Sequence, residues 1–236
     1  MKTVAAIAIV GTASLIASAD AGFLGFVASV RNVGGNTIVD VFAGVSNASD
    51  KFLNVYNTVS DTVFVQKAGL ATKTWKPDAN GFTSTRNTLD DSFMTAGTFS
   101  GGQYGGEYYA SANTNGDPNF TGTSWNATPA SALATTIPNL AGWYTGDPTS
   151  IDNVSESLLG MIGRVDGTGA ASATRGIWCA HFVIAGNNAA FNFSAYTSIK
   201  DGVTGGTSQG QSSFIPTPGA LALLGLASFA SRRRRA

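Results

Sequence analysis

Apolar and polar residues alternate with a period of two along much of the chain, which predicts β-strands rather than helices. The three valines of segment 38–45 fall on one face, and residues 191–195 show the same alternation. Segment 177–184 (IWCAHFVI) is apolar at nearly every position and predicts a strand that is buried on both faces. Turn sequences such as Gly186-Asn187-Asn188 separate the runs. We therefore expect residues 22–200 to form an all-β domain, an antiparallel sandwich of jelly-roll type.

Composition agrees with a β-rich domain and limits what can stabilise it. Only 12% of the residues are charged, while glycine alone contributes 29 residues, which is typical of an extracellular domain with many turns. Cys179 is the only cysteine, so no disulfide can form within the chain, and its apolar neighbours predict a buried, inert thiol. Residues 201–214 (DGVTGGTSQGQSSF) are typical of a flexible linker.

The first 21 residues have the layout of a secretory signal peptide. Lys2 supplies a positive start, residues 4–16 form an apolar stretch that predicts a signal helix, and Ala19-Asp20-Ala21 is an A-x-A cleavage site. Signal peptidase would cut after Ala21 and leave Gly22 as the new N-terminus. An earlier cut after Ala19 and a retained anchor are the alternatives.

The C-terminal residues 215–236 combine a proline motif, an apolar run and a basic cluster. The motif is Pro216-Thr217-Pro218, the apolar run 219–231 predicts a short helix, and the basic cluster consists of Arg232, Arg233, Arg234 and Arg235. A helix over residues 220–231 is roughly 18 Å long, short against a hydrocarbon core of about 30 Å. Arginines that remain on the cytoplasmic side would anchor it in the membrane, at least transiently. A disordered basic tail is the alternative.

This tail resembles the PEP-CTERM sorting signal of exported bacterial proteins, which is also labelled an ice-binding-protein C-terminal motif. The resemblance covers residues 215–235, and Thr217 stands where the family usually has glutamate, as in a variant common in planctomycete-type proteins. It implies that an exosortase-like enzyme processes the tail and that the protein reaches the cell envelope or the extracellular space. Regularly spaced threonines, which an ice-binding surface would need, are not visible in the sequence.

The charge balance changes once the two ends are set aside. Lys2 and the four tail arginines leave nine basic residues of the 14, and Asp20 leaves 13 acidic residues of the 14, so the exported body carries a net charge of −4. There is no basic stripe, and nucleic acid is therefore not an expected partner.

Candidate catalytic and metal-binding residues are few, and we predict that the protein is not an enzyme. His181 is the only histidine; with Cys179 two residues before it on the same predicted strand face, it is expected to be a satisfied core histidine. Calcium, the one cofactor considered, would take oxygen ligands from Asp90, Asp91 and Asp117.

Carbohydrate is the main alternative partner. Aromatic residues gather in the loop-rich middle of the chain, and Trp125, Trp143 and Tyr144 are the candidates for stacking on sugar rings; the competing interpretation places them in the core. A polysaccharide hydrolase would have to use Glu107 and Glu156, the only glutamates. The leading interpretation remains an exported envelope or matrix protein with a structural or interaction role.

Overall fold

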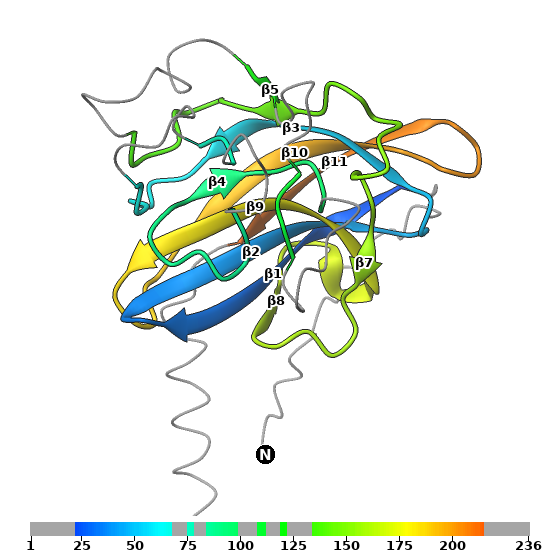
Figure 1. The fold of residues 1–236 in the computed structure, drawn as a ribbon. Helices are drawn as coiled ribbons and strands as arrows, with labels where there is room; N and C mark the ends of the chain where they lie inside the picture. The colour runs from blue at the N-terminus through cyan, green and yellow to red at the C-terminus, as the bar shows by residue number, and fades with distance from the viewer. Residues whose placement is uncertain are drawn as a thin grey trace, which may run out of the picture.

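The computed structural model describes residues 22–67, 75–77, 84–98, 108–111, 119–121 and 134–214, which form two antiparallel β-sheets packed face to face (Figure 1). Sheet A has the strand order β4-β9-β2-β1-β8, and β7 also pairs with β9. Its strands are β1 (Phe23–Val33), β2 (Asn36–Val45), β4 (Phe93–Met94), β7 (Glu156–Ser157), β8 (Arg164–Asp166) and β9 (Arg175–Ala185).

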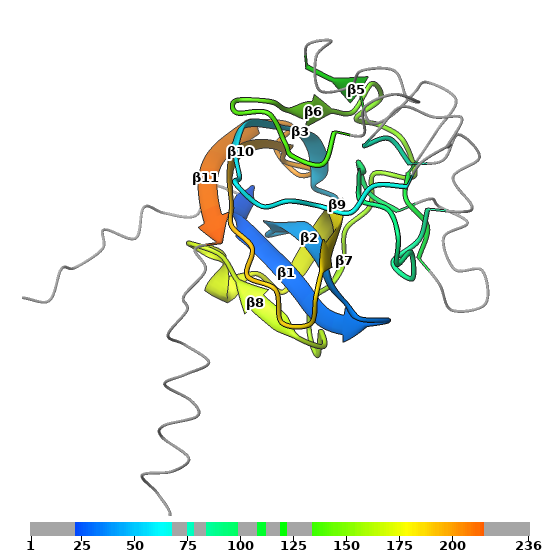
Figure 2. The same ribbon diagram turned by 90° about the vertical axis from the view of Figure 1, so that its left-hand side faces the viewer.

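Sheet B has the strand order β11-β10-β3-β6-β5. Its strands are β3 (Lys51–Val59), β5 (Asn119–Phe120), β6 (Trp143–Tyr144), β10 (Phe193–Lys200) and β11 (Thr207–Phe214). One short 3₁₀ turn, η1 (Ala170–Ser172), precedes β9. The chain crosses repeatedly from one sheet to the other, for example between β2 and β3 and between β9 and β10. In Figure 2, β3 and β10 lie above β1 and β2.

The main hydrophobic core fills the space between the sheets and confirms the sandwich. The three valines of β2 that the alternation places on one face are all fully buried there. Phe182 of β9 packs against Phe64 and against Phe193 of β10, with ring centroids 4.6 and 5.8 Å apart. Aromatic contacts of this kind join the two sheets, and burial of such rings is the main stabilising term available to a domain without a disulfide.

A β-bulge in β9 corrects one expectation. The pairing of β2 with β9 shifts between Val41 and Phe42, so that Cys179 is the extra residue between the partners Ala180 and Trp178. A bulge reverses the alternation of side chains beyond it. Cys179 and Phe182 therefore face the core between the sheets, while His181 lies with Trp178 on the opposite face of sheet A. The prediction that Cys179 and His181 share a face was wrong.

Residues 201–214 also differ from expectation, because they are not a linker. After a turn at 201–206, β11 pairs with β10 along its whole length, from Thr207 opposite Lys200 to Phe214 opposite Phe193. Serine side chains of β11 also bond to the backbone of β1: the N–H groups of Phe23 and Phe26 donate to Ser208 and Ser212, each over 3.0 Å. The first and last strands of the sandwich are thus joined to each other.

The segments expected to form the signal helix (1–21) and the apolar tail helix (219–231) lie outside the described residues. Within the described part of the chain, no helix combines the length and apolarity that a membrane crossing requires.

Cys179 gives a direct test of the core. Its side chain is fully buried, its Sγ donates to the carbonyl of Val41 over 3.3 Å, and burial raises the pKa of the thiol far above its usual value. Because the thiolate is the reactive form, we expect the native protein to resist a thiol reagent for hours and the unfolded protein to react within minutes. Mass spectrometry after timed labelling measures both rates; a native rate close to the unfolded rate would contradict the buried position.

Candidate functional site

Sheet A is buried on its outer face as well as its inner one. A second apolar cluster lies there, formed by Val27, Phe42, Phe93, Ala110, Leu158, Ala170, Ala173 and Trp178. Half of these residues lie in the sheet A strands β1, β2, β4 and β9, and the other half lie in the segments 108–111 and 156–173, which together with 84–92 cover the sheet. The covering segments contain little regular secondary structure, so their attachment depends on specific side-chain contacts.

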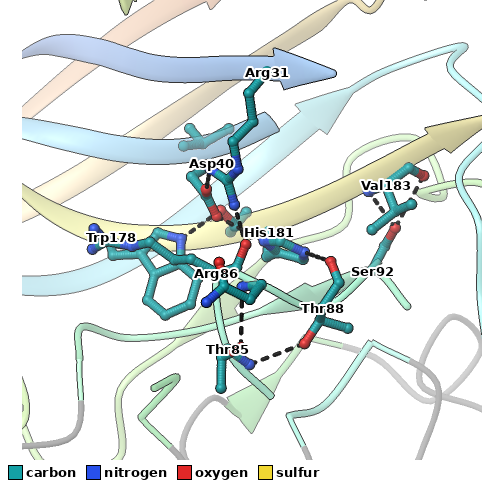
Figure 3. Close-up of polar contacts among 12 residues, drawn as sticks. Arg31, Asp40, Thr85, Arg86, Thr88, Ser92, Trp178, His181 and Val183 are labelled. Atoms are coloured by element: carbon teal, nitrogen blue, oxygen red, sulfur yellow. Dashed lines mark hydrogen bonds and ion pairs between the residues drawn. The ribbon is translucent and has the colours of Figure 1, made fainter. Parts of the chain in front are cut away.

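Asp40 and His181 form the centre of that attachment (Figure 3). They are partners in the pairing of β2 with β9, both side chains are fully buried, and Nδ1 of His181 lies 2.7 Å from Oδ1 of Asp40. On the other side of the ring, Nε2 lies 2.9 Å from the carbonyl oxygen of Thr88. A carboxylate and a carbonyl are both acceptors, so the ring satisfies both contacts only when each nitrogen carries a proton. The pair is then an ion pair.

Arg31 extends this pair to the covering segment. Its guanidinium donates to Asp40 and also to the backbone carbonyl of Arg86 (Figure 3). Burial by itself would raise the pKa of Asp40, but the charges of His181, Arg31 and Arg86 and the hydrogen bond from His181 hold the pKa below its usual value. Asp40 is therefore ionised at neutral pH.

Arg86 is enclosed by aromatic rings. Its guanidinium carbon lies 4.1 Å from the ring centroid of Tyr108 and 4.8 Å from those of Phe42 and Trp178. It also forms an ion pair with Glu156, whose pKa is raised by burial despite the opposing effect of Arg86. Cation–π contacts of a desolvated guanidinium are worth about 2 kcal/mol. We call Arg31, Asp40, Arg86, Glu156 and His181 together the buried charge cluster.

The geometry of the buried charge cluster suits attachment better than catalysis. A general base must reach a substrate proton, yet both nitrogens of His181 are already bonded and its side chain has no exposed area. Glu156, one of the two carboxylates of the hydrolase alternative, is held by Arg86, and Glu107 lies outside the described residues. Ser208, in the middle of a G-x-S-x-G match at 206–210, lies in β11 and accepts the N–H of Phe23 rather than sitting in a strained turn.

The structure describes two of the three candidate calcium ligands, and both have other partners. Asp90 is exposed and forms an ion pair with Lys67, with its Oδ2 3.1 Å from Nζ. Asp91 is buried, accepts the backbone N–H of Lys67, and has a pKa raised to about 6, chiefly by burial. Asp117 lies outside the described residues. No group of three or more acidic, histidine or cysteine side chains that could hold a metal ion occurs in the described ranges.

The candidate sugar-stacking residues divide between core and surface. Trp143 is fully buried between the sheets, so the alternative that placed it in the core was right for this residue. Tyr144, its neighbour on β6, points the other way and is 42% exposed. Trp125 lies outside the described residues.

Sequence reasoning missed an uncharged surface on sheet B, which we call the tyrosine face. Tyr144 lies opposite Asn54, and Tyr56 lies opposite Tyr196, with the two rings stacked at 5.5 Å. The glutamines of β11 continue both rows, Gln209 beside Ser198 and Gln211 beside Tyr196. Tyr196 is 36% exposed, and none of these side chains is charged. The clue in the sequence was the alternation within β10, whose outward positions include this tyrosine.

Asp40 carries the first prediction for the charge cluster. Replacing it by asparagine leaves the cations of His181 and Arg31 buried without their anion, and we expect a loss of about 3–5 kcal/mol in unfolding free energy at pH 7. Because the pKa of Asp40 is lowered from 3.8 on folding, its contribution is present above that value and is lost as the pH falls through the folded pKa. The part of the gap between wild type and Asp40→Asn that comes from this carboxylate should therefore shrink below about pH 4.

Chemical denaturation across pH 2–8 (roughly the range in which a carboxylate titrates) measures this gap. The pKa of Asp91 is raised on folding, so its effect on the pH dependence of stability is opposite to that of Asp40. Asp91 is present in both proteins, and its contribution therefore cancels when their unfolding free energies are subtracted. Asp166→Asn is the matched control, because the Arg164–Asp166 pair is partly exposed and should cost at most about 1 kcal/mol. Equal losses in the two variants would contradict a stabilising role for the buried pair.

Comparison with known proteins identifies no relative: no family model matches the chain, and neither a curated protein nor a solved structure matches it. The function of the chain must therefore be argued from its own residues.

Proposed function

We propose that this chain is an exported protein, cut after Ala21 and sorted through residues 215–236, with a structural or interaction role in the cell envelope or extracellular matrix rather than a catalytic one. The observation that supports this best is the position of the fold between the two signals. The first strand begins at Phe23, and the last one ends at Phe214. All the strands that the structure describes lie between residues 22 and 214.

Removal of either signal would therefore leave the described sandwich complete. Its first and last strands are joined through Ser208 and Ser212, so the edges next to both processing sites are already bonded within the domain. We place the sandwich among jelly-roll-like folds as part of this proposal, because the chain crosses repeatedly between the two antiparallel sheets. Signal peptidase and an exosortase-like enzyme are the proposed processing partners.

The tail would act through its position in the membrane. The apolar run 219–231 would stop translocation, and the arginines would remain on the cytoplasmic side, because moving each charge across the bilayer is costly. Prolines disfavour helix in the residue before them, so Pro216 and Pro218 would keep the segment outside the bilayer extended and open to a protease. The sandwich would remain outside the cell throughout.

Neutralising the arginine cluster tests this topology. Replacing Arg232–Arg235 by glutamine should let the tail pass through the membrane or escape processing, while the sandwich folds unchanged. Replacing the same four residues by lysine keeps the charge and is the matched control, which should be retained and trimmed like the wild type. Cell fractionation and the intact mass of the mature protein measure the outcome; a glutamine variant that is processed normally would refute the topological role.

A second candidate function, binding of a neutral polysaccharide, is favoured by the tyrosine face. Aromatic rings can stack on the apolar faces of sugar rings, and the exposed amides of Gln209 and Gln211 offer both donors and acceptors to hydroxyl groups. An uncharged surface suits a polysaccharide without acidic groups. The face consists of backbone-paired strands, so its rings are held at fixed spacing before any ligand arrives.

Two substitutions test this second candidate. Tyr196→Ala and Tyr144→Ala should each lower the affinity for a neutral polysaccharide by about tenfold, because each removes one stacking surface. Tyr196→Phe keeps the ring and should keep most of the affinity. Affinity electrophoresis in gels that contain β-glucans or α-glucans, with a glycan array to choose the sugar, measures the change. Wild-type protein that binds no glycan on the array would exclude the tyrosine face as a sugar site.

A further inference from the structure

The residue that follows the proposed cleavage site is already bonded within the fold. The backbone nitrogen of Gly22 donates to Oγ of Ser46 over 3.1 Å, and Ser46 in turn donates to Oδ2 of Asp50 over 3.1 Å. Ser46 and Asp50 belong to the turn between β2 and β3, which lies beside the start of β1 because β1 and β2 are paired. A single hydroxyl therefore links the nitrogen of Gly22 to a carboxylate.

Asp50 is an acidic group without a cation. Its side chain is fully buried, and among the described residues it takes part in no salt bridge. Its hydrogen-bond donors are all neutral: the hydroxyl of Ser46, the N–H of Asn47 at 2.9 Å and the N–H of Gly202 at 3.1 Å. A buried charge is normally paired, because desolvation is costly. By contrast, Asp40 of β2, which is also fully buried, has two cationic partners.

We propose that the turn 46–50 is a binding site for the α-ammonium group that cleavage after Ala21 creates on Gly22. The inference rests on the proposed export and cleavage. Hydrolysis of the Ala21–Gly22 peptide bond consumes one water, leaves a carboxylate on Ala21 and converts the amide nitrogen of Gly22 into an amine that is protonated at neutral pH. The nitrogen that donates one hydrogen bond to Ser46 in the uncut chain then has three donors and a positive charge.

The new charge would complete the site around Asp50. A hydrogen bond to a charged group is worth more than one between neutral groups, and the ammonium would be linked through Ser46 to the buried carboxylate. A cut after Ala19 would place the ammonium on Asp20, two residues before Gly22, and leave Gly22 with a neutral N–H.

The other charged side chains near the turn 46–50 are either bonded elsewhere or exposed to solvent. Nζ of Lys51 donates to the carbonyl of Asn153 over 3.0 Å, and Arg175, which pairs with Val45, donates to Ser155. Lys200 is exposed. Asp201 uses its carboxylate on the N–H groups of Val203 and Thr204. None of these groups is paired with Asp50 in a salt bridge.

The experiment compares chains that differ only at the N-terminus. Chains that begin at Gly22, at Ala21 and at Asp20, each continuing to Ala236, are released from a fusion by a site-specific protease. In the chains that begin at Ala21 and Asp20, the nitrogen of Gly22 is a neutral amide N–H. In the chain that begins at Gly22, the same nitrogen is the α-ammonium group. We expect the Gly22 chain to melt about 3–6 °C above the other two at pH 7. Equal melting temperatures would overturn the proposal.

Substitution at the site and a pH series separate this outcome from a general effect of extra residues. Asp50→Asn should abolish the difference between the Gly22 and Ala21 chains. Asp201→Asn, in the neighbouring turn, is the matched control and should preserve it. A captured ammonium has its pKa raised above the usual value of about 8, so the difference should be full below that pH and vanish as the pH rises past the raised pKa. A difference that does not change between pH 7 and 10 (approximate limits set by that amine) would refute the capture even if Asp50→Asn failed to fold.

Failure of this inference and failure of the proposed function are distinguishable. N-terminal sequencing of the exported protein reports where cleavage occurs, whereas the three purified chains report whether Gly22 is held. If the exported protein begins at Gly22 but the three purified chains melt at the same temperature, the proposed export is supported and the proposed binding site is refuted.

Discussion

The ion pair between Asp40 and His181 is the contact on which the outer layer of the molecule depends. It joins β2 to β9 and, through Thr88, fastens the segment that covers them. A buried ion pair gives a domain little net stability by itself, because desolvation offsets the attraction. Its effect is specificity: the covering segment has almost no regular structure of its own, and only one position of that segment satisfies His181, Arg31 and Arg86 together.

Periodicity in the sequence was enough to predict β2, β9, part of β10 and the sandwich, but not β11 or which side chains meet. The bulge at Cys179 changed the face of His181, and no residue there marks a bulge in advance. In β6, Trp143 and Tyr144 are adjacent, so alternation requires that they point to opposite faces; which of them is buried depends on the core around Val55. Asp40 was missed as a site because a lone aspartate among valines carries no local motif, and its partner His181 lies 141 residues away in the sequence.

The segment 201–214 shows why composition misled. Serine, glycine and glutamine are typical of linkers, yet the same residues form an edge strand whose outward positions are polar. Two of the serines also satisfy N–H groups of β1, where the sandwich would otherwise have an open edge. A short, small side chain is needed for that role, which is why apolar periodicity is weak in this strand.

The two outer faces of the sandwich differ in what they can offer to a partner. A ligand for the outer face of sheet A would have to displace a fully buried carboxylate from two cations and an arginine from three aromatic rings. The tyrosine face of sheet B needs no such rearrangement, because its rings and amides are already exposed on paired strands. Binding free energy is not spent there on ordering or uncovering the surface. If the protein interacts with a matrix through either of these two faces, the charge cluster therefore directs that interaction to sheet B by closing sheet A.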